Sequence, residues 1–360
     1  MQVNDNVRMK HFGNFIALLI LAINALFTGL LLLVAYSPYI QPVAHPVQSC
    51  FGLTFPIFAL INGAFLIFWL VIQRYKTALL PLIGFLLCYS QLRTYLPLNF
   101  HTANPPEESI KFLSYNIMGF NGAVKKDGKN PILTYLKESN ADILCLQEYA
   151  SDESPRRLTQ KDIERELKDY PYHRISVVGS GSGYTNKIAC YSKFPILSAR
   201  VLNYPSGYNG SVLYELKLNE DTITLINNHL ESNKLTKADK DIYEDILKAP
   251  EKEKVISGAR LLVHKLAEAS AIRAPQADTI AREIASSRYP SVIVCGDFND
   301  TPISYAHRVI AQSLDDAFTQ SGRGLGISYN QNKFYFRIDN ILISKNLQSY
   351  NCTVDQSIKG

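Results

Sequence analysis

Polar side chains stand at the ends of several apolar, strand-like segments of this 360-residue chain. Asn116 follows one such segment, Glu148 a second, His229 a third, and Asp297 and Asn299 a fourth. A strand that is buried on both faces delivers the side chain at its tip into whatever crevice the sheet opens toward. A single Asn, Asp or His at such a place is more often a turn former or a structural residue. Several of them in one stretch of chain indicate a site.

The residue types fit the hydrolysis of a phosphate ester. A carboxylate such as Glu148 is a hard oxygen ligand for Mg²⁺, which keeps most of its waters and bridges to substrate phosphate through one or two carboxylates. Asp297 can orient or deprotonate an attacking water. Asn116, Asn299 and His229 can donate hydrogen bonds to the oxygens on which charge grows. The metal would supply the remaining charge stabilisation.

Five short motifs occur in order within residues 111–343. They are Ser114-Tyr115-Asn116, Leu146-Gln147-Glu148, Asn228-His229-Leu230-Glu231-Ser232, Gly296-Asp297-Phe298-Asn299-Asp300-Thr301-Pro302 and Arg337-Ile338-Asp339. With these motifs the chain resembles the endonuclease/exonuclease/phosphatase superfamily. The resemblance implies an α/β fold, a four-layer sandwich of two mixed β-sheets flanked by helices. It also implies Mg²⁺- or Mn²⁺-dependent hydrolysis of phosphoesters.

The resemblance assigns roles to the residues at the strand ends. Glu148 would be the principal metal ligand, and Asn116 would lie beside the metal. Asp297 would position the nucleophilic water, and Asn299 would stabilise the transition state. His229 would contact the scissile phosphate.

The chain departs from the family pattern near its C-terminal end. In the family the Asp of the Arg-Ile-Asp motif, here Asp339, orients a catalytic His on the last strand, but no His follows Asp339 before Gly360. Either the chain is truncated before that motif or the protein has lost the residue, and we expect truncation. This form would then lack a sheet strand and be impaired in catalysis. Within the motifs, Asn228 and Arg337 are expected to bind substrate.

The first third of the chain is apolar. Residues 1–100 hold five basic side chains and one acidic side chain, and residues 12–72 contain no Asp, Glu, Lys or Arg. Phe15–Ala35 and Gly52–Ile72 each supply the roughly 20 apolar residues that cross a hydrocarbon core. A third run, Thr77–Leu92, is interrupted by a proline, which membrane helices tolerate when neighbours satisfy the freed carbonyls. The sequence therefore predicts an integral membrane protein with two or three spans, in contact with membrane lipid.

The basic residues that flank these spans predict their orientation. Arg8 and Lys10 precede the first span, the first loop has no basic residue, and Arg74 and Lys76 follow the second span. The positive-inside rule places the N-terminus in the cytoplasm. With three spans the catalytic domain lies outside the cytoplasm and with two it lies inside. We expect the extracytoplasmic arrangement.

The chain divides into a membrane region (1–97), a linker (98–110) and a catalytic domain (111–360). From Lys111 onward, short β-rich runs alternate with polar helical stretches, which favours packed sheets flanked by helices. The expected strands are Lys111–Ile117, Ile143–Gln147, His173–Val178, Lys187–Tyr191, Ser211–Leu218, Thr222–Asn228, Ser291–Cys295 and Arg337–Ile343. The expected helices are Pro131–Glu138, Gln160–Leu167, Ser257–Ser286 and Ser304–Gln312.

The charge of the soluble part bears on the substrate. Residues 101–360 hold 32 basic and 31 acidic side chains, a net charge of +1, whereas nucleic-acid binding normally leaves a strong positive footprint. The leading hypothesis is a membrane-anchored, metal-dependent phosphodiester hydrolase of the nuclease or phosphodiesterase type. The alternatives are a phospholipid phosphodiesterase of the sphingomyelinase type and a catalytically impaired protein that binds a phosphate ligand. The substrate would be nucleic acid or a phospholipid headgroup, and no protein partner is predicted.

Overall fold

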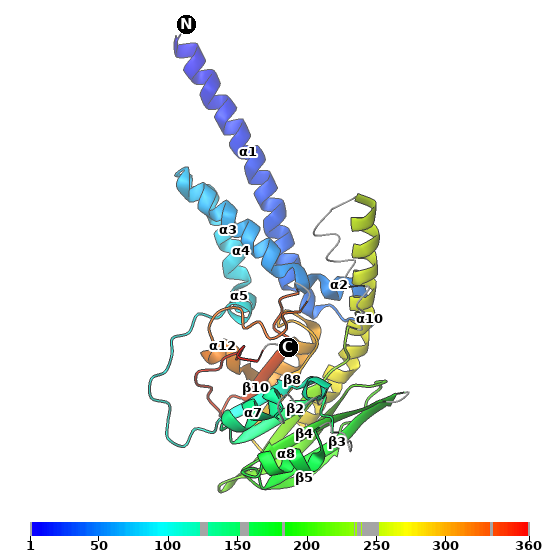
Figure 1. Cartoon of the computed structure of the whole chain (residues 1–360). Coiled ribbons are helices and arrows are strands. Elements are labelled where there is room, and N and C mark those ends of the chain that lie inside the picture. The colour runs from blue at the N-terminus through cyan, green and yellow to red at the C-terminus, as the bar shows by residue number, and fades with distance from the viewer. Residues whose placement is uncertain are drawn as a thin grey trace.

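The chain forms an apolar helical region followed by an α/β sandwich (Figure 1). The structure is a computed structural model. It describes residues 2–122, 129–151, 158–181, 184–233, 235, 239, 252–331 and 334–358.

The helical region begins with the long helix α1 (Gln2–Ala35) and ends with the short helix α5 (Tyr89–Tyr95). Between them lie η1 (Ser37–Tyr39), α2 (Pro46–Ser49), η2 (Cys50–Thr54), α3 (Phe55–Val71) and α4 (Tyr75–Leu87). Proline occupies the first or second position of η1, α2 and α3, where its missing N–H removes no helical hydrogen bond. The predicted third apolar run is divided at Cys88 into α4 and α5, and Pro81 lies inside α4.

Two stretches of this region are long and apolar enough to cross a membrane. They are Phe12–Tyr39 and Pro46–Val71, and α4 is a shorter apolar helix. In the most apolar part of each stretch, only 22% and 17%, respectively, is buried inside the protein. Most of their apolar surface is therefore left without a protein cover.

A hydrogen-bonded polar network joins α1 to α3. Thr28 Oγ1 donates to Asn62 Oδ1 at 2.8 Å, and Trp69 Nε1 donates to Asn24 Oδ1 at 3.0 Å. All four side chains are buried. A Cβ on Gly84 would lie 2.7 Å from Thr28 Cγ2, so this glycine lets α4 approach α1. Small residues and satisfied polar groups of this kind let helices pack closely against one another.

The sandwich contains two mixed sheets. The first has the order β1-β2-β4-β3, with β1 (Phe112–Asn116) and β2 (Ile143–Gln147) parallel and β3 (Tyr172–Gly181) and β4 (Tyr184–Ser192) antiparallel. The second has the order β5-β6-β7-β8-β10-β9, and in it only β7 and β8 are parallel neighbours. Its strands are β5 (Ile196–Val201), β6 (Gly210–Leu218), β7 (Asp221–His229), β8 (Val292–Asp297), β9 (Leu314–Asp316) and β10 (Asp339–Ser344).

Helices cover the outer face of each sheet. Apolar side chains of α7 (Pro131–Glu138) and α8 (Gln160–Glu166) pack on the first sheet, and those of α10 (Lys252–Ala285) and α11 (Tyr305–Ile310) pack on the second. The inner faces of the two sheets share a third apolar cluster, to which Cys145, Cys190 and Cys295 belong. The layers are thus helix, sheet, sheet, helix, and the predicted four-layer α/β sandwich is confirmed.

Most of the predicted elements are present. Strand β2 and helix α7 have the predicted bounds, and the other predicted strands and helices are shifted by a few residues at their ends. Strands β5 and β9 and the short helices α6 (Met118–Gly122) and α12 (Ala317–Ser321) were not predicted. Strand β9 has only three residues, and α6 and α12 have five each, too few for a hydrophobic periodicity to emerge.

The loop between α1 and α3 rests on the sandwich. Arg308 Nε donates to the Pro38 carbonyl at 2.8 Å, and the guanidinium stacks 4.7 Å from the ring centre of Tyr39. A Cβ on Gly52 would lie 2.0 Å from the Ile303 carbonyl oxygen. Only glycine permits this approach of the loop to the segment that follows β8.

The other end of the helical region points away from the sandwich (Figure 1). Arg74, in the turn between α3 and α4, donates to Asn14 Oδ1 at 3.0 Å. The α3–α4 turn therefore lies beside the N-terminal part of α1, whereas the α1–α3 loop and α5 lie on the side of the sandwich.

Candidate active site

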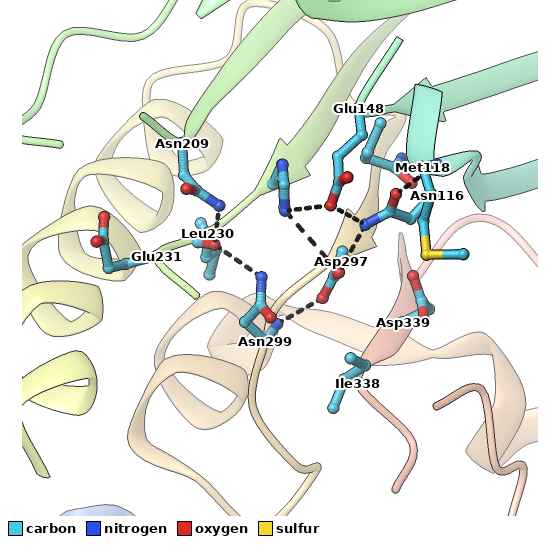
Figure 2. A network of polar contacts seen from close by, with 12 residues as sticks. Asn116, Met118, Glu148, Asn209, Leu230, Glu231, Asp297, Asn299, Ile338 and Asp339 are labelled. Atoms are coloured by element: carbon cyan, nitrogen blue, oxygen red, sulfur yellow. Dashed lines mark hydrogen bonds and ion pairs between the residues drawn. The ribbon is translucent and has the colours of Figure 1, made fainter. Parts of the chain in front are cut away.

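Side chains from both sheets meet at one edge of the sandwich (Figure 2). Asn116 Nδ2 donates to Glu148 Oε1 at 2.9 Å and to Asp297 Oδ2 at 3.1 Å. His229 Nε2 lies 3.6 Å from Glu148 Oε1 and 4.0 Å from Asp297 Oδ2. The structure thus brings together four of the residues that the strand-end pattern singled out.

The strand registers explain this convergence. Strands β7 and β8 are parallel and in register, so His229 lies opposite Asp297 at their carboxyl ends. Strand β10 is antiparallel to β8 and places Asp339, at its beginning, opposite Asp297 as well. Asn116 ends β1 in the facing sheet, and Glu148 follows β2. The carboxyl ends of the parallel pairs therefore form one edge.

Backbone geometry directs two of these side chains. Glu148 and Asn299 both have φ near +50°, in the left-handed region that side chains rarely adopt. Strained backbone of this kind collects at functional sites. Gly296, with φ of +121°, passes so close to β7 that a Cβ would lie 2.0 Å from the Asn228 carbonyl oxygen. The chain therefore turns sharply at both strand ends.

The cluster gathers negative charge in a buried place. Burial raises the pKa of Asp297 to about 6, despite the opposing hydrogen bonds from Asn116 and from the Asn299 backbone. Burial and the neighbouring Asp297 raise the pKa of Asp339 to about 7. Asp339 Oδ1 is buried and has no hydrogen-bond partner. A cation at this edge would relieve both effects.

The donor set fits a magnesium-type ion held mainly by one carboxylate. The described part of the chain contains no group of three or more His, Cys, Asp or Glu side chains arranged to hold a metal. The Glu148 side chain is 37% exposed, and Mg²⁺ uses one or two carboxylates and completes its shell with water and phosphate. Asn116 Oδ1 accepts from the Met118 N–H at 3.1 Å, so the amide turns its NH₂ toward Glu148. In this orientation Asn116 holds the Glu148 carboxylate through its NH₂, while its oxygen is engaged by the backbone.

Asn299 lies next to the cluster with its amide engaged. Its backbone N–H donates to Asp297 Oδ1 at 2.8 Å, and its Nδ2 donates to the Leu230 carbonyl at 2.9 Å. Asn209 Nδ2 donates to the same carbonyl at 2.7 Å (Figure 2). Asn209 was not predicted, because it belongs to no motif and lies just before β6.

Asn186 was also missed by the sequence reasoning. Its Nδ2 lies 3.2 Å from His229 Nδ1 and donates to the Tyr208 carbonyl at 3.0 Å. Asn186 is buried inside β4, so no strand-end position distinguishes it in the sequence.

Two predicted substrate-binding residues do not join the cluster. Asn228 is fully buried, its amide atoms have no hydrogen-bond partner, and strand alternation turns it away from the face that carries His229. Arg337 is buried, with its guanidinium over the Phe318 ring and a hydrogen bond of 2.6 Å to the Thr94 carbonyl. Both side chains thus lie apart from the cluster, and their predicted contact with substrate stays a prediction.

Two family models match the chain. The model described as "Endonuclease/Exonuclease/phosphatase family" matches residues 113–355, which is about two thirds of the chain. The model described as "Domain of unknown function (DUF8431)" matches residues 17–95. No curated protein matches the chain.

Several solved structures are similar to the sandwich. TDP2 of D. rerio, humanized by 14 mutations, is 15% identical over 68% of this chain and 87% of its own, with a TM-score of 0.42. A β-hairpin deletion mutant of beta toxin from Staphylococcus aureus is 17% identical over 71% of this chain and 93% of its own, with a TM-score of 0.45. The human Nocturnin catalytic domain is 15% identical over 69% of this chain and 85% of its own, with a TM-score of 0.42.

Proposed function

Because the chain belongs to the endonuclease/exonuclease/phosphatase family, we propose that it is a membrane-anchored, metal-dependent phosphodiester hydrolase. The observation that carries this proposal is the Asn116 amide, which bridges the carboxylates of Glu148 and Asp297 from opposite sheets. The bridge holds two like charges within reach of one phosphate, with the His229 ring beside them.

Each residue of the cluster has a role that its surroundings support. Glu148 would hold Mg²⁺ or Mn²⁺, and the metal supplies charge stabilisation at the phosphoryl oxygens when it is bound. Asp297 accepts from the Asn299 backbone through Oδ1, which leaves Oδ2 on the side of Asn116 to orient the attacking water. Asn299, through the second hydrogen of its amide, and His229 would donate hydrogen bonds to the phosphoryl group, while Asn116 keeps its NH₂ on the two carboxylates. Asp339 lies opposite Asp297 in the register of β10 and β8.

The helical region supports anchoring by three spans. Asn14, at the level of the α3–α4 turn, and Tyr36, after the end of α1, are separated by 22 residues. At 1.5 Å per residue this is about 33 Å, close to the ~30 Å of a hydrocarbon core. The α1–α3 loop and α5 both contact the sandwich. A catalytic domain on the side opposite the N-terminus agrees with this arrangement and, by the positive charges at Arg74 and Lys76, is extracytoplasmic.

A phospholipid is a second candidate substrate. The segment after Asn299 touches the α1–α3 loop at Ile303, and the segment before Asp339 touches α5 through Arg337. The edge of the sandwich that carries the cluster is thus the edge joined to the spans. A headgroup phosphodiester of the same bilayer would be close to it.

Hydrolysis by the full chain in detergent or vesicles tests the proposal. Mg²⁺- or Mn²⁺-dependent cleavage of bis(p-nitrophenyl) phosphate is expected, with a loss of about 10²–10⁴-fold in Asp297→Asn. Plasmid nicking and release of phosphocholine or phosphoethanolamine from vesicles then separate nucleic acid from lipid. If no phosphodiester is cleaved, and phosphate-ligand binding survives Glu148→Gln, the protein is a binding protein and the proposal is wrong.

A further inference from the structure

The imidazole of His229 is contacted through both of its nitrogens. Nδ1 lies 3.2 Å from Asn186 Nδ2, and Nε2 faces the carboxylates of Glu148 and Asp297 at 3.6 and 4.0 Å. The His229 and Asn186 side chains are both buried. Neighbouring protein groups therefore determine which nitrogen of the His229 ring carries the proton.

The orientation of the Asn186 amide is fixed by its other contact. Nδ2 donates to the Tyr208 carbonyl at 3.0 Å. The rotated amide would bring Oδ1 against that carbonyl, where neither oxygen has a hydrogen to share. The atom that faces His229 is thus an NH₂ nitrogen, which is a donor only. Nδ1 must accept, so the ring proton is on Nε2.

Two glycines make this contact possible. A Cβ on Gly179 would lie 2.2 Å from the Tyr208 carbonyl oxygen, and a Cβ on Gly210 would lie 2.6 Å from a side chain of β3. Gly179 is the register partner of Asn186, and Gly210 is the register partner of His229. The Tyr208 carbonyl can reach Asn186 because both positions are glycine and have no Cβ.

We propose that Asn186 is a positioning residue that fixes His229 as the Nε2–H tautomer, so that His229 serves as a neutral hydrogen-bond donor to the phosphoryl group. The part that concerns substrate rests on the proposed function. In the resting site Nε2–H faces the acceptors Glu148 and Asp297, and a phosphoryl oxygen between them is an acceptor of the same kind. Because Nδ1 accepts from Asn186, the ring proton is on Nε2. Nε2 therefore cannot accept a proton from water.

The tautomer is read by ¹⁵N NMR of the full chain labelled with ring-¹⁵N histidine. The signals of His229 are assigned by their loss in His229→Gln. In the wild type we expect a protonated Nε2 and an unprotonated Nδ1. In Asn186→Asp, which has the same shape and can only accept, the proton is expected on Nδ1. Asn219→Asp, in the exposed turn between β6 and β7, is the matched control and should leave the wild-type signals unchanged.

Kinetics of Asn186→Ala complete the test, because this variant adds no charge near the phosphate. Loss of an outer partner that orients a metal-ligating histidine typically costs about 10–100-fold, and we expect a loss of similar size for the partner of His229. We expect that loss in kcat with little change in KM, and a mixture of both His229 tautomers. A wild-type Nδ1–H signal, an Asn186→Asp spectrum like that of the wild type, or an unchanged kcat in Asn186→Ala would each overturn the proposal.

The two proposals fail in different ways. A wild-type Nε2–H signal in a protein that cleaves no phosphodiester keeps the tautomer assignment and rejects the hydrolase. Turnover with a wild-type Nδ1–H signal rejects the assignment alone. If Asn186→Asp does not fold, the wild-type spectrum and Asn186→Ala still decide.

Discussion

Arg337 donates a hydrogen bond of 2.6 Å to the backbone carbonyl of Thr94 and so joins the segment before Asp339 to the last turn of α5. The same guanidinium nitrogen lies 3.4 Å from Asp316 Oδ2, and His307 Nε2 lies 3.2 Å from that oxygen. Arg337, Asp316 and His307 form a largely buried polar group between the helical region and the sandwich. The arginine is a structural junction.

Removal of this arginine is expected to destabilise the fold. Arg337→Leu leaves the carboxylate of Asp316 with one fewer partner in a buried place, and breaking a buried pair costs about 3–5 kcal/mol. Denaturant unfolding of the full chain in detergent measures the change. Lys345→Ala, an exposed site after β10, should stay within about 0.5 kcal/mol of the wild type. A loss of unfolding free energy below about 1 kcal/mol in Arg337→Leu would show that Arg337 contributes little to stability.

Asp316 predicts how stability depends on pH. Burial by itself would raise its pKa, but the hydrogen bond from His307 and the charge of Arg337 lower it from 3.8 to about 2. The ionised carboxylate therefore stabilises the folded state above about pH 4, and this stabilisation is lost as the pH falls toward 2. We expect a contribution of about 2 kcal/mol from this group. The measurement is unfolding free energy at pH 2–5 in the wild type and in Asp316→Asn, whose pH profile should be flatter over that interval. Parallel profiles would contradict the prediction.

A side chain at Gly52 should impair catalysis from a distance. Gly52→Val places a Cβ against the Ile303 carbonyl and displaces the segment that follows Asn299. A displacement of about 1 Å at a reacting group can cost about 10²-fold in rate. Gly63→Ala, in α3, is the control, because a Cβ there meets nothing within 4 Å. Equal kcat values for the two variants would show that the contact between Gly52 and Ile303 does not affect catalysis.

Glu148 is expected to control metal binding. Glu148→Gln should weaken Mn²⁺ binding and lower kcat/KM by about 10²-fold or more, since a metal contributes several kcal/mol of charge stabilisation. Glu220→Gln, in the exposed β6–β7 turn, changes the same group and should have no effect. Mn²⁺ titration followed by electron paramagnetic resonance measures the affinity. Unchanged affinity in Glu148→Gln would assign the metal to other groups.

The strand-end residues could be found in the sequence because an apolar, β-rich run precedes each of them. Asp297 follows an apolar run and one glycine, and His229 follows a β-rich run and two asparagines, so each run predicts a strand and the polar residues mark its end. The meeting of four such tips then follows from parallel pairing of β1 with β2 and of β7 with β8. For these residues the position predicted from the local sequence agrees with the position in the fold.

Other parts of the site depend on contacts that local sequence does not encode. Arg337 was expected at the substrate, but its partner Thr94 is 243 residues away in a helix that the sequence reasoning did not separate from a span. Asn186 becomes part of the site only because a glycine on the neighbouring strand admits the Tyr208 carbonyl. Such choices between partners are made by tertiary packing, which pattern and propensity do not describe.

The fit of Gly52 against Ile303 also limits how the gene can change. A membrane anchor that served only as a tether could be exchanged for any other hydrophobic hairpin. The helical region of this chain meets the sandwich through a backbone-to-backbone approach that requires glycine on one side and a fixed carbonyl on the other. A recombinant with a foreign anchor would lose that match, so the two halves of the protein should be inherited together and vary in concert.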